Sequence, residues 1–150
     1  PKDGNELRDL LFTATLNKAK PFTIRYPKEQ SINFEKKAPS KIDIGSWEVL
    51  TKGSDVLILA VGSMVSKSLE VNSMLSEKNI NSEEGVTDGG FGEGIINWSN
   101  KNNISNSILT LGVPNRFVDH GPRNVLLEEI GLDSMTLYEK IYNFLRESSE

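Results

Sequence analysis

The pattern of apolar and polar residues predicts a helix near the start of the chain. Asp3 precedes Glu6 by three residues, which is the spacing of a capping box. Apolar residues then recur at helical intervals, at Leu7, Leu10, Leu11 and Ala14. We therefore expect a helix from about Glu6 to Lys18.

After this helix the pattern changes to that of a strand and then to that of a linker. Apolar and polar residues alternate from Phe22 to Tyr26, which predicts a strand that Pro27 ends. The stretch from Lys28 to Trp47 is polar and shows no sustained period, so we interpret it as a linker. The predicted division is a short first part at residues 1–30, a linker at residues 31–46 and a main domain at residues 47–150.

The main domain begins with a pattern that is typical of α/β proteins. The apolar run from Val56 to Val61 predicts a strand covered on both faces. A helix follows, and its apolar stripe consists of Met64, Val65, Leu69, Met74 and Leu75. A strand, a turn and a helix in this order favour an α/β fold class.

Four further elements are predicted after residue 90. The residues Phe91, Ile95, Ile96 and Trp98 fit one helix, and Ser107 to Leu111 fits a short buried strand. Val125 to Ile130 and Met135 to Leu145 fit two more helices, the last with Ser134 as its N-cap. The α/β pattern is interrupted only between Asn79 and Glu84, where acidic residues stand in place of an apolar strand.

Composition limits the classes of function. A chain of 150 residues with 37% hydrophobic content suffices for one main domain. The net charge of −4 provides no broad basic surface, so we expect no nucleic-acid binding. Without cysteine and with one histidine, thiolate catalysis and multi-histidine metal sites are excluded. No apolar run approaches the roughly 20 residues of a membrane span, so we expect a soluble protein without membrane contact.

Several motifs have the residue types of an active site but not the spacing. The glycines from Gly89 to Gly94 lack the dinucleotide-binding pattern, so we interpret them as turn residues that let the backbone approach a neighbouring strand. Ser63 follows Gly62 at a strand end without the second glycine of a nucleophile elbow, so an N-cap role is favoured.

The remaining titratable candidates are a histidine and an acidic pair. His120 is a candidate general base, although a lone histidine in a turn is more often structural. Glu83 and Glu84 are adjacent, so on an extended segment they point to opposite faces and do not form an acid–base pair. Only one of the two glutamates can then be buried and functional, and no residue is assigned as catalytic.

The strongest local chemical signal is Arg25-Tyr26-Pro27-Lys28. Two cations flank a proline at the predicted strand end, which suits the binding of a phosphate or carboxylate group. A salt bridge to a neighbouring domain is the equally weighted alternative. We retain Arg25 and Lys28 as candidate substrate-binding residues.

Taken in order, several segments carry a resemblance to a known family. They are Glu6 to Leu11, Pro21 to Lys28, Ile44 to Glu48, Asp55 to Val65, Glu83 to Gly94, Leu111 to Gly121 and Gly131 to Asp133. Over nearly the whole chain they resemble 1-deoxy-D-xylulose-5-phosphate synthases. The phrase from Val113 to Gly121 discriminates best, because related transketolase-like enzymes share the strand and helix pattern but not this phrase.

The resemblance implies the fold, the reaction and the cofactors. The main domain is expected to be a three-layer α/β/α transketolase C-terminal-like domain with a mostly parallel sheet, preceded by a helix and strand from the end of the pyrimidine-binding domain. The enzymes are homodimers in the cytoplasm of bacteria or in a plastid-type organelle. They use thiamine diphosphate and Mg²⁺ to condense pyruvate with glyceraldehyde 3-phosphate, with loss of carbon dioxide, in isoprene biosynthesis. The ligands of the cofactor lie upstream in the family, so none is expected here.

Two positions depart from the family pattern. The family's Arg-Tyr-Pro-Arg-Gly places its second arginine on the substrate phosphate, and that position is Lys28 here. Lysine keeps the charge but loses the bidentate fork, and Glu29 replaces the glycine. Arg25 resembles a structural partner more than a substrate ligand.

The interrupted pattern near residue 80 also has a counterpart in the resemblance. The family carries a strand, a helix and a second strand between the positions of Ile80 and Glu83, so we expect a missing segment between Ser82 and Glu83. Two alternatives to a part of an intact synthase remain. One is an isolated, non-catalytic structural or dimerisation domain, and the other is a β-subunit-like part of a 2-oxo acid dehydrogenase.

Overall fold

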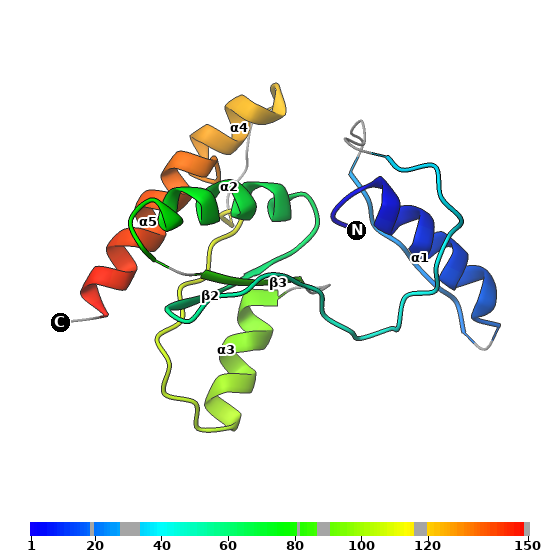
Figure 1. Ribbon diagram of the computed structural model, residues 1–150, viewed down its shortest axis with the longest axis horizontal. Helices are drawn as coiled ribbons and strands as arrows, with labels where there is room; N and C mark the ends of the chain where they lie inside the picture. The colour runs from blue at the N-terminus through cyan, green and yellow to red at the C-terminus, as the bar shows by residue number, and fades with distance from the viewer. Residues whose placement is uncertain (19, 28–33, 81, 87–90, 116–119, 149–150) are drawn as a thin grey trace.

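The computed structural model describes residues 1–18, 20–27, 34–80, 82–86, 91–115 and 120–148 of the chain (Figure 1). The fold class is α/β: three helices lie on one side of a small sheet, and a further helix extends from its other side (Figure 1). A separate helix near the N-terminus stands beside this α/β unit. The predicted fold class is confirmed.

The first helix, α1 (Gly4–Leu16), is capped as the sequence predicted. Asp3 is the N-cap, and its Oδ1 accepts a hydrogen bond of 2.8 Å from the backbone N–H of Glu6. The Glu6 carboxylate in turn accepts from the backbone N–H of Lys2. Satisfying these otherwise unpaired donors fixes the start of the helix.

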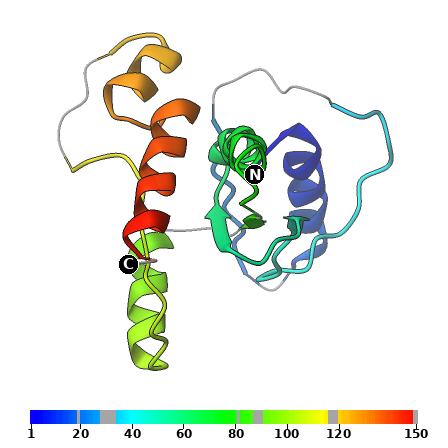
Figure 2. The same cartoon turned by 60° about the vertical axis from the view of Figure 1, so that its left-hand side comes forward.

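The predicted linker packs along α1. The backbone N–H of Glu35 donates to Asn5 Oδ1 at 2.9 Å, and that of Ile42 donates to Thr13 Oγ1 at 2.9 Å. Arg8 Nη1 donates to the carbonyl of Glu35 at 2.8 Å. These bonds attach residues 34–42 to the helix, so this part of the predicted linker forms one unit with α1 (Figure 2).

Residues Phe22 to Tyr26 do not form the predicted strand. A strand requires a neighbour that pairs with its backbone, and the three strands of the described chain pair only among themselves. The alternation of apolar residues alone therefore gave a wrong prediction at this segment.

The sheet consists of β1 (Val49–Thr51), β2 (Val56–Ala60) and β3 (Ser82–Val86), in the order β1-β3-β2. β2 and β3 are parallel, and β1 and β3 are antiparallel. β2 was predicted. β1 and β3 were not, and β3 consists of the acidic stretch at which the pattern was interrupted. Ser82 and Glu83 are consecutive residues of β3. The missing segment between them stays a prediction.

Helix α2 (Met64–Ser76) and helix α5 (Ser134–Glu147) build the core against the sheet. Their buried apolar residues are Val71, Leu75, Leu132 and Leu137, with Val56 and Ile58 of β2 packed against them. The helical stripe predicted from Met64 to Leu75 is thereby confirmed. Helix α4 (Arg123–Glu129) lies on the same side of the sheet (Figure 1).

The start of α5 corrects one cap. Asp133 is the N-cap, and its Oδ1 accepts from the backbone N–H groups of Met135 at 3.1 Å and Thr136 at 3.0 Å. Ser134, the predicted cap, is the first helical residue, and its hydroxyl donates to a carboxylate oxygen of Glu70 on α2. The backbone of Asp133 is extended, with φ −73° and ψ 160°, and its side chain accepts from the first helical N–H groups, so Asp133 is the cap.

The other side of the sheet is only partly covered. Helix α3 (Phe91–Lys101), which was predicted, runs away from the sheet rather than along it (Figure 1). Leu57 of β2 is 59% exposed on this side. The expectation that β2 is covered on both faces is therefore wrong for the described chain.

The predicted strand from Ser107 to Leu111 is also absent. The sheet of the described residues consists of β1, β3 and β2 alone, and residues 107–111 pair with none of them. The segment instead passes close to α3, where a Cβ on Gly92 would lie 2.9 Å from Thr110 Cγ2. Gly92 thus permits the close backbone approach that the glycines predicted, although Gly89 and Gly90 lie outside the described residues.

Candidate functional site

The predicted phosphate-binding residues are only partly within the described chain. Arg25 lies in the extended segment 21–27 and is exposed. Lys28 lies outside the described residues, so the pairing of these two cations remains a prediction. Phe22, three residues before Arg25, lines the larger of two cavities, so this segment passes beside a concave surface.

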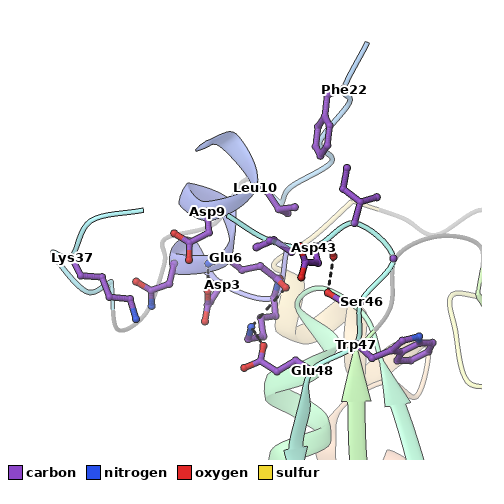
Figure 3. A pocket seen from close by; sticks show the side chains of 15 residues that line it. Asp3, Glu6, Asp9, Leu10, Phe22, Lys37, Asp43, Ser46, Trp47 and Glu48 are labelled. Atoms are coloured by element: carbon purple, nitrogen blue, oxygen red, sulfur yellow. Dashed lines mark hydrogen bonds and ion pairs between the residues drawn. The ribbon is translucent and has the colours of Figure 1, made fainter. Parts of the chain in front are cut away.

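That cavity measures about 420 Å³ and lies at the junction of α1 with residues 42–48 (Figure 3). One wall comes from α1, with Glu6 and Leu10, and the facing wall comes from a tight turn before Trp47. In this turn Ser46 donates from its backbone N–H to the carbonyl of Asp43 at 3.2 Å and from its hydroxyl to the same oxygen at 2.7 Å. Gly45 has a φ of +83°, which the turn requires and which glycine adopts without strain.

An ion-pair cluster closes one end of this cavity. Lys2 Nζ lies 2.5 Å from Glu48 Oε2 and 3.7 Å from Glu6 Oε1, so it bridges the start of α1 and the residue before β1. Burial lowers the pKa of Lys2, but the hydrogen bond to Glu48 and the charges of Glu6, Glu48 and Asp3 together raise it above the usual value. Lys2 therefore stays charged and holds α1 to the α/β unit.

A second cluster, formed around Arg8 and Asp9, joins α1 to residues 34–42. Arg8 Nε donates to Asp9 Oδ1 at 2.8 Å, and the Arg8 guanidinium lies 5.8 Å from the centre of the Phe34 ring. The hydrogen bond from Arg8 holds the pKa of the Asp9 carboxyl below its usual range, and the backbone N–H of Ser40 contributes at 3.2 Å. These side chains are engaged in holding residues 34–42 against the helix.

The second cavity, of about 340 Å³, lies near the carboxyl end of β2. Its walls come from α2, α4 and the N-cap of α5, and they carry charges of both signs: Lys67, Arg123, Glu128 and Asp133. In α/β folds ligands bind at the carboxyl ends of strands, so a ligand is expected at this position.

Ser63 is at this end of the sheet and does not have the environment of a nucleophile. It occupies the N-cap position of α2, but its side chain does not cap the helix. Instead Ser63 Oγ accepts a hydrogen bond of 2.6 Å from Arg123 Nη2. A serine activated for attack donates its proton to a base, so the contact with a guanidinium indicates a structural role.

The other candidates of the sequence are not brought together. His120 is exposed and forms no hydrogen bond or ion pair with the described residues. Glu83 and Glu84 are neighbours in β3, in register with Leu57 and Ile58 of β2. In the described part of the chain, no general base, nucleophile and orienting group converge on one point.

The described residues were also compared with what a metal ion requires. Among them there is no group of three or more His, Asp or Glu side chains that could hold a metal ion. Binding residues for thiamine diphosphate and Mg²⁺ are therefore not assigned in this chain.

No described helix is both long and apolar enough to span a membrane.

The sequence is similar to those of several known enzymes over nearly its whole length. The chain is 33% identical to the 1-deoxy-D-xylulose-5-phosphate synthase of Dictyoglomus turgidum over 98% of its length, and 31% identical to that of Halothermothrix orenii over 100%. For the Aquifex aeolicus protein the values are 30% and 97%. The resemblance to 1-deoxy-D-xylulose-5-phosphate synthases is confirmed. No protein-family model matches the chain.

The alignments cover nearly all of this chain but only part of each relative. The chain spans 28% of the length of each of these three relatives and corresponds to a C-terminal part of them. The alignment with the D. turgidum synthase runs over 177 residues, whereas this chain has 150. The D. turgidum synthase therefore carries at least 27 residues, the difference of 177 and 150, that have no counterpart here.

Solved structures give the same answer for the fold. A split-gene transketolase, described as an inactive β4 tetramer, superimposes with a TM-score of 0.62 at 21% identity and covers 77% of this chain and 48% of its own. A transketolase of Pichia stipitis gives a TM-score of 0.53 at 16% identity, with 69% of this chain and 18% of that chain covered. The chain thus has a transketolase-like α/β fold.

The residues that the sequence missed are those that join distant segments. Lys2 with Glu48 and Arg123 with Ser63 are separated by 46 and 60 positions along the chain. No local motif marks such pairs, so they became visible only in the folded chain.

Proposed function

We propose that this chain is part of a thiamine-diphosphate-dependent transferase of the 1-deoxy-D-xylulose-5-phosphate synthase type. The parent enzyme condenses pyruvate with glyceraldehyde 3-phosphate, releases carbon dioxide and forms 1-deoxy-D-xylulose 5-phosphate for isoprene biosynthesis. The observation that carries this proposal is the 30–33% identity to three such synthases over 97–100% of the chain. The parent acts as a homodimer, in the bacterial cytoplasm or a plastid-type organelle.

In this proposal the described residues serve the architecture and not the bond-making steps. The ion pairs of Lys2 and the hydrogen bonds along residues 34–42 hold α1 beside the α/β unit. Thiamine diphosphate, with its Mg²⁺, supplies the electron sink for decarboxylation and is held by residues of the parent outside this set. The 150 residues alone are expected to be inactive.

Within the chain, Lys28 and Arg25 are the proposed contacts to the phosphate of glyceraldehyde 3-phosphate. Their cationic side chains flank Pro27, whose fixed φ restricts the backbone between them. Phosphate is bound well by lysine as a point charge, without the two-point geometry of arginine. Lys28 is therefore assigned the substrate contact and Arg25 a supporting role.

The alternative is a non-catalytic structural or dimerisation module. A specific observation favours keeping it: a structural neighbour of 21% identity is a split-gene transketolase described as an inactive tetramer of its β chain. A chain of this fold can thus exist apart from the rest of an enzyme. A β-subunit-like part of a 2-oxo acid dehydrogenase is a weaker alternative, because the relatives named above are all synthases.

The mass of the native polypeptide separates the first two proposals. We expect an antibody against this chain, used on an extract of the source cells, to detect a polypeptide several times larger than 16.7 kDa. Peptide mapping of that band should show residues beyond this sequence. A native polypeptide close to 16.7 kDa would support the structural module instead and would remove the basis for assigning activity to one chain.

The role of Lys28 is tested in the parent enzyme by Lys28→Ala, with the exposed Lys36→Ala as control. If Lys28 binds the substrate phosphate, its loss should raise the KM for glyceraldehyde 3-phosphate by about tenfold or more and leave the KM for pyruvate nearly unchanged. The Lys36 variant should resemble the unmodified enzyme. Equal changes in both KM values would contradict the assignment.

A further inference from the structure

Helix α1 joins the α/β unit without an apolar core. Both apolar clusters of the described residues lie within the α/β unit, between Leu50 and Tyr142. The buried residue of α1 is Thr13, whose hydroxyl donates to the carbonyl of Asp9 and accepts from the backbone N–H of Ile42. These partners belong to α1 and to residues 34–42, which we call together the α1 unit. Burial of apolar surface, the dominant stabilising term in most folds, therefore does not hold the α1 unit against the α/β unit.

An ion pair spans the junction of the two units. Lys2 Nζ lies 2.5 Å from Glu48 Oε2, and it also lies 3.7 Å from Glu6 Oε1 at the start of α1. The carbonyl oxygen of Pro1 lies in addition 3.6 Å from the position of a Cβ on Gly62. Salt weakens a charge pair, because the Debye length falls from about 10 Å at 0.1 M to about 3 Å at 1 M ionic strength. The strength of this junction should therefore depend on salt.

The chain between the two units has the properties of a hinge. Residues 43–46 form the tight turn described above, and all four are exposed. A Cβ placed on Gly45 would meet no atom within 4 Å, so no packed neighbour restrains the turn. Gly45 has a φ of +83°, and glycine changes its backbone conformation at little steric cost. Hinges are built from a few loop residues that absorb such a change.

The cavity at this junction shows that the two units do not interlock. Its volume is about 420 Å³, whereas well-packed protein interiors have few voids larger than a water molecule. Leu10 and Phe22 line it on the side of α1, and Trp47 lines it on the side of the turn (Figure 3). Lys2 and Glu48 also line the cavity, so their ion pair lies across one end of it.

We propose that the ion pair of Lys2 with Glu48 is a latch, and that the turn at residues 43–46 is the hinge on which the α1 unit moves. With the pair formed, the junction cavity is closed at that end. With the pair broken, the α1 unit rotates away and the cavity opens. Arg25 follows α1 in the chain, so the hinge also sets the distance of this candidate phosphate contact from the α/β unit. The latch itself does not depend on the proposed reaction.

The experiment measures a distance between the two units by pulsed electron paramagnetic resonance. Because the chain has no cysteine, spin labels can be attached at Leu11→Cys on α1 and Leu69→Cys on α2, where the native side chains are 53% and 40% exposed. The doubly labelled chain should show one narrow distance at about 0.1 M salt. Adding Glu48→Gln should introduce a second, longer distance and raise the ratio of open to closed molecules about fivefold. Glu77→Gln is the matched control, because Glu77 is exposed at the C-cap of α2, and it should leave the distance unchanged.

The salt dependence provides a second readout that needs no charge variant. Raising the salt to about 1 M should shift the chain with Glu48 toward the longer distance and should leave Glu48→Gln nearly unchanged, since its latch is already lost. Far-ultraviolet circular dichroism should show equal helix content in both states. A distance that neither salt nor Glu48→Gln alters would overturn the proposal. So would a broad distribution at about 0.1 M, because the chain would then have no closed state. If Glu48→Gln unfolds, the salt series of the chain with Glu48 decides.

Discussion

Replacing Leu75 by alanine should remove a large part of the stability of the α/β unit. Leu75 is 0% exposed and lies in the core with Val71, Leu132 and Leu137, between α2 and α5. A buried leucine truncated to alanine loses its transfer free energy and leaves a cavity, which together cost about 3 to 5 kcal/mol. For a domain with a total of roughly 5–15 kcal/mol, this is a substantial fraction.

The assay is urea unfolding followed by far-ultraviolet circular dichroism. With a slope of about 2 kcal/mol per molar urea, a loss of about 3 kcal/mol lowers the midpoint by about 1.5 M. Leu69→Ala is the matched control on the same helix, because Leu69 is 40% exposed and should shift the midpoint much less. Equal shifts for the two variants would refute the packing of α2 against α5 described above.

Two further predictions concern the N-cap of α5. Asp133→Ala should lower the free energy of unfolding by about 1 kcal/mol, because the backbone N–H groups of Met135 and Thr136 lose their acceptor. Asp133→Asn keeps an acceptor oxygen and should lower this free energy less. Equal losses for the two variants, measured by urea unfolding, would contradict the role of Asp133 as the N-cap. The hydrogen bonds from the side chain and backbone of Thr136, with that of Met135, hold the pKa of the Asp133 carboxyl below its usual value of 3.8. The resulting stabilisation is therefore complete above that value and is lost as the pH falls through the folded-state pKa, so acid titration of the unfolding midpoint should be less steep below about pH 4 for Asp133→Asn than for the unmodified chain.

The helices could be predicted because the signals that define them are local. The capping of α1 by Asp3 and the apolar stripe of α2 each lie within a few residues of one another, and both were confirmed. The N-cap of α5 was wrong by one residue, since Asp133 and Ser134 are both good capping residues and only the geometry distinguishes them. Local chemistry therefore identifies a helix more reliably than its first residue.

The strands were less predictable because a strand depends on its neighbours. Phe22 to Tyr26 has the alternation of a strand and Ser107 to Leu111 has its hydrophobicity, but neither has a pairing partner in the described chain. β3, in contrast, has an acidic and glycine-containing sequence and is nevertheless a strand, because β1 and β2 supply hydrogen bonds on both sides. Tertiary context outweighs intrinsic preference in each case.

The candidate site of Arg25 and Lys28 depends on the resemblance and stays a prediction, because Lys28 lies outside the described residues. Nothing in the local pattern at Arg25 and Lys28 distinguishes a phosphate contact from a salt bridge, so the assignment to a substrate depends on the family phrase around them. The contacts of Lys2 with Glu48 and of Arg123 with Ser63 could not be predicted, because their members are far apart in sequence. What the sequence cannot specify is which distant cation meets which distant acceptor.

The open edge of β2 connects the fold with the comparisons. In an α/β domain, a strand as apolar as Val56 to Ala60 is normally flanked by strands on both sides, with helices on both faces. The D. turgidum synthase carries at least 27 residues that this chain lacks, the difference of 177 and 150, and a strand with its helix requires about that length. The 59% exposure of Leu57 in β2 departs from that arrangement.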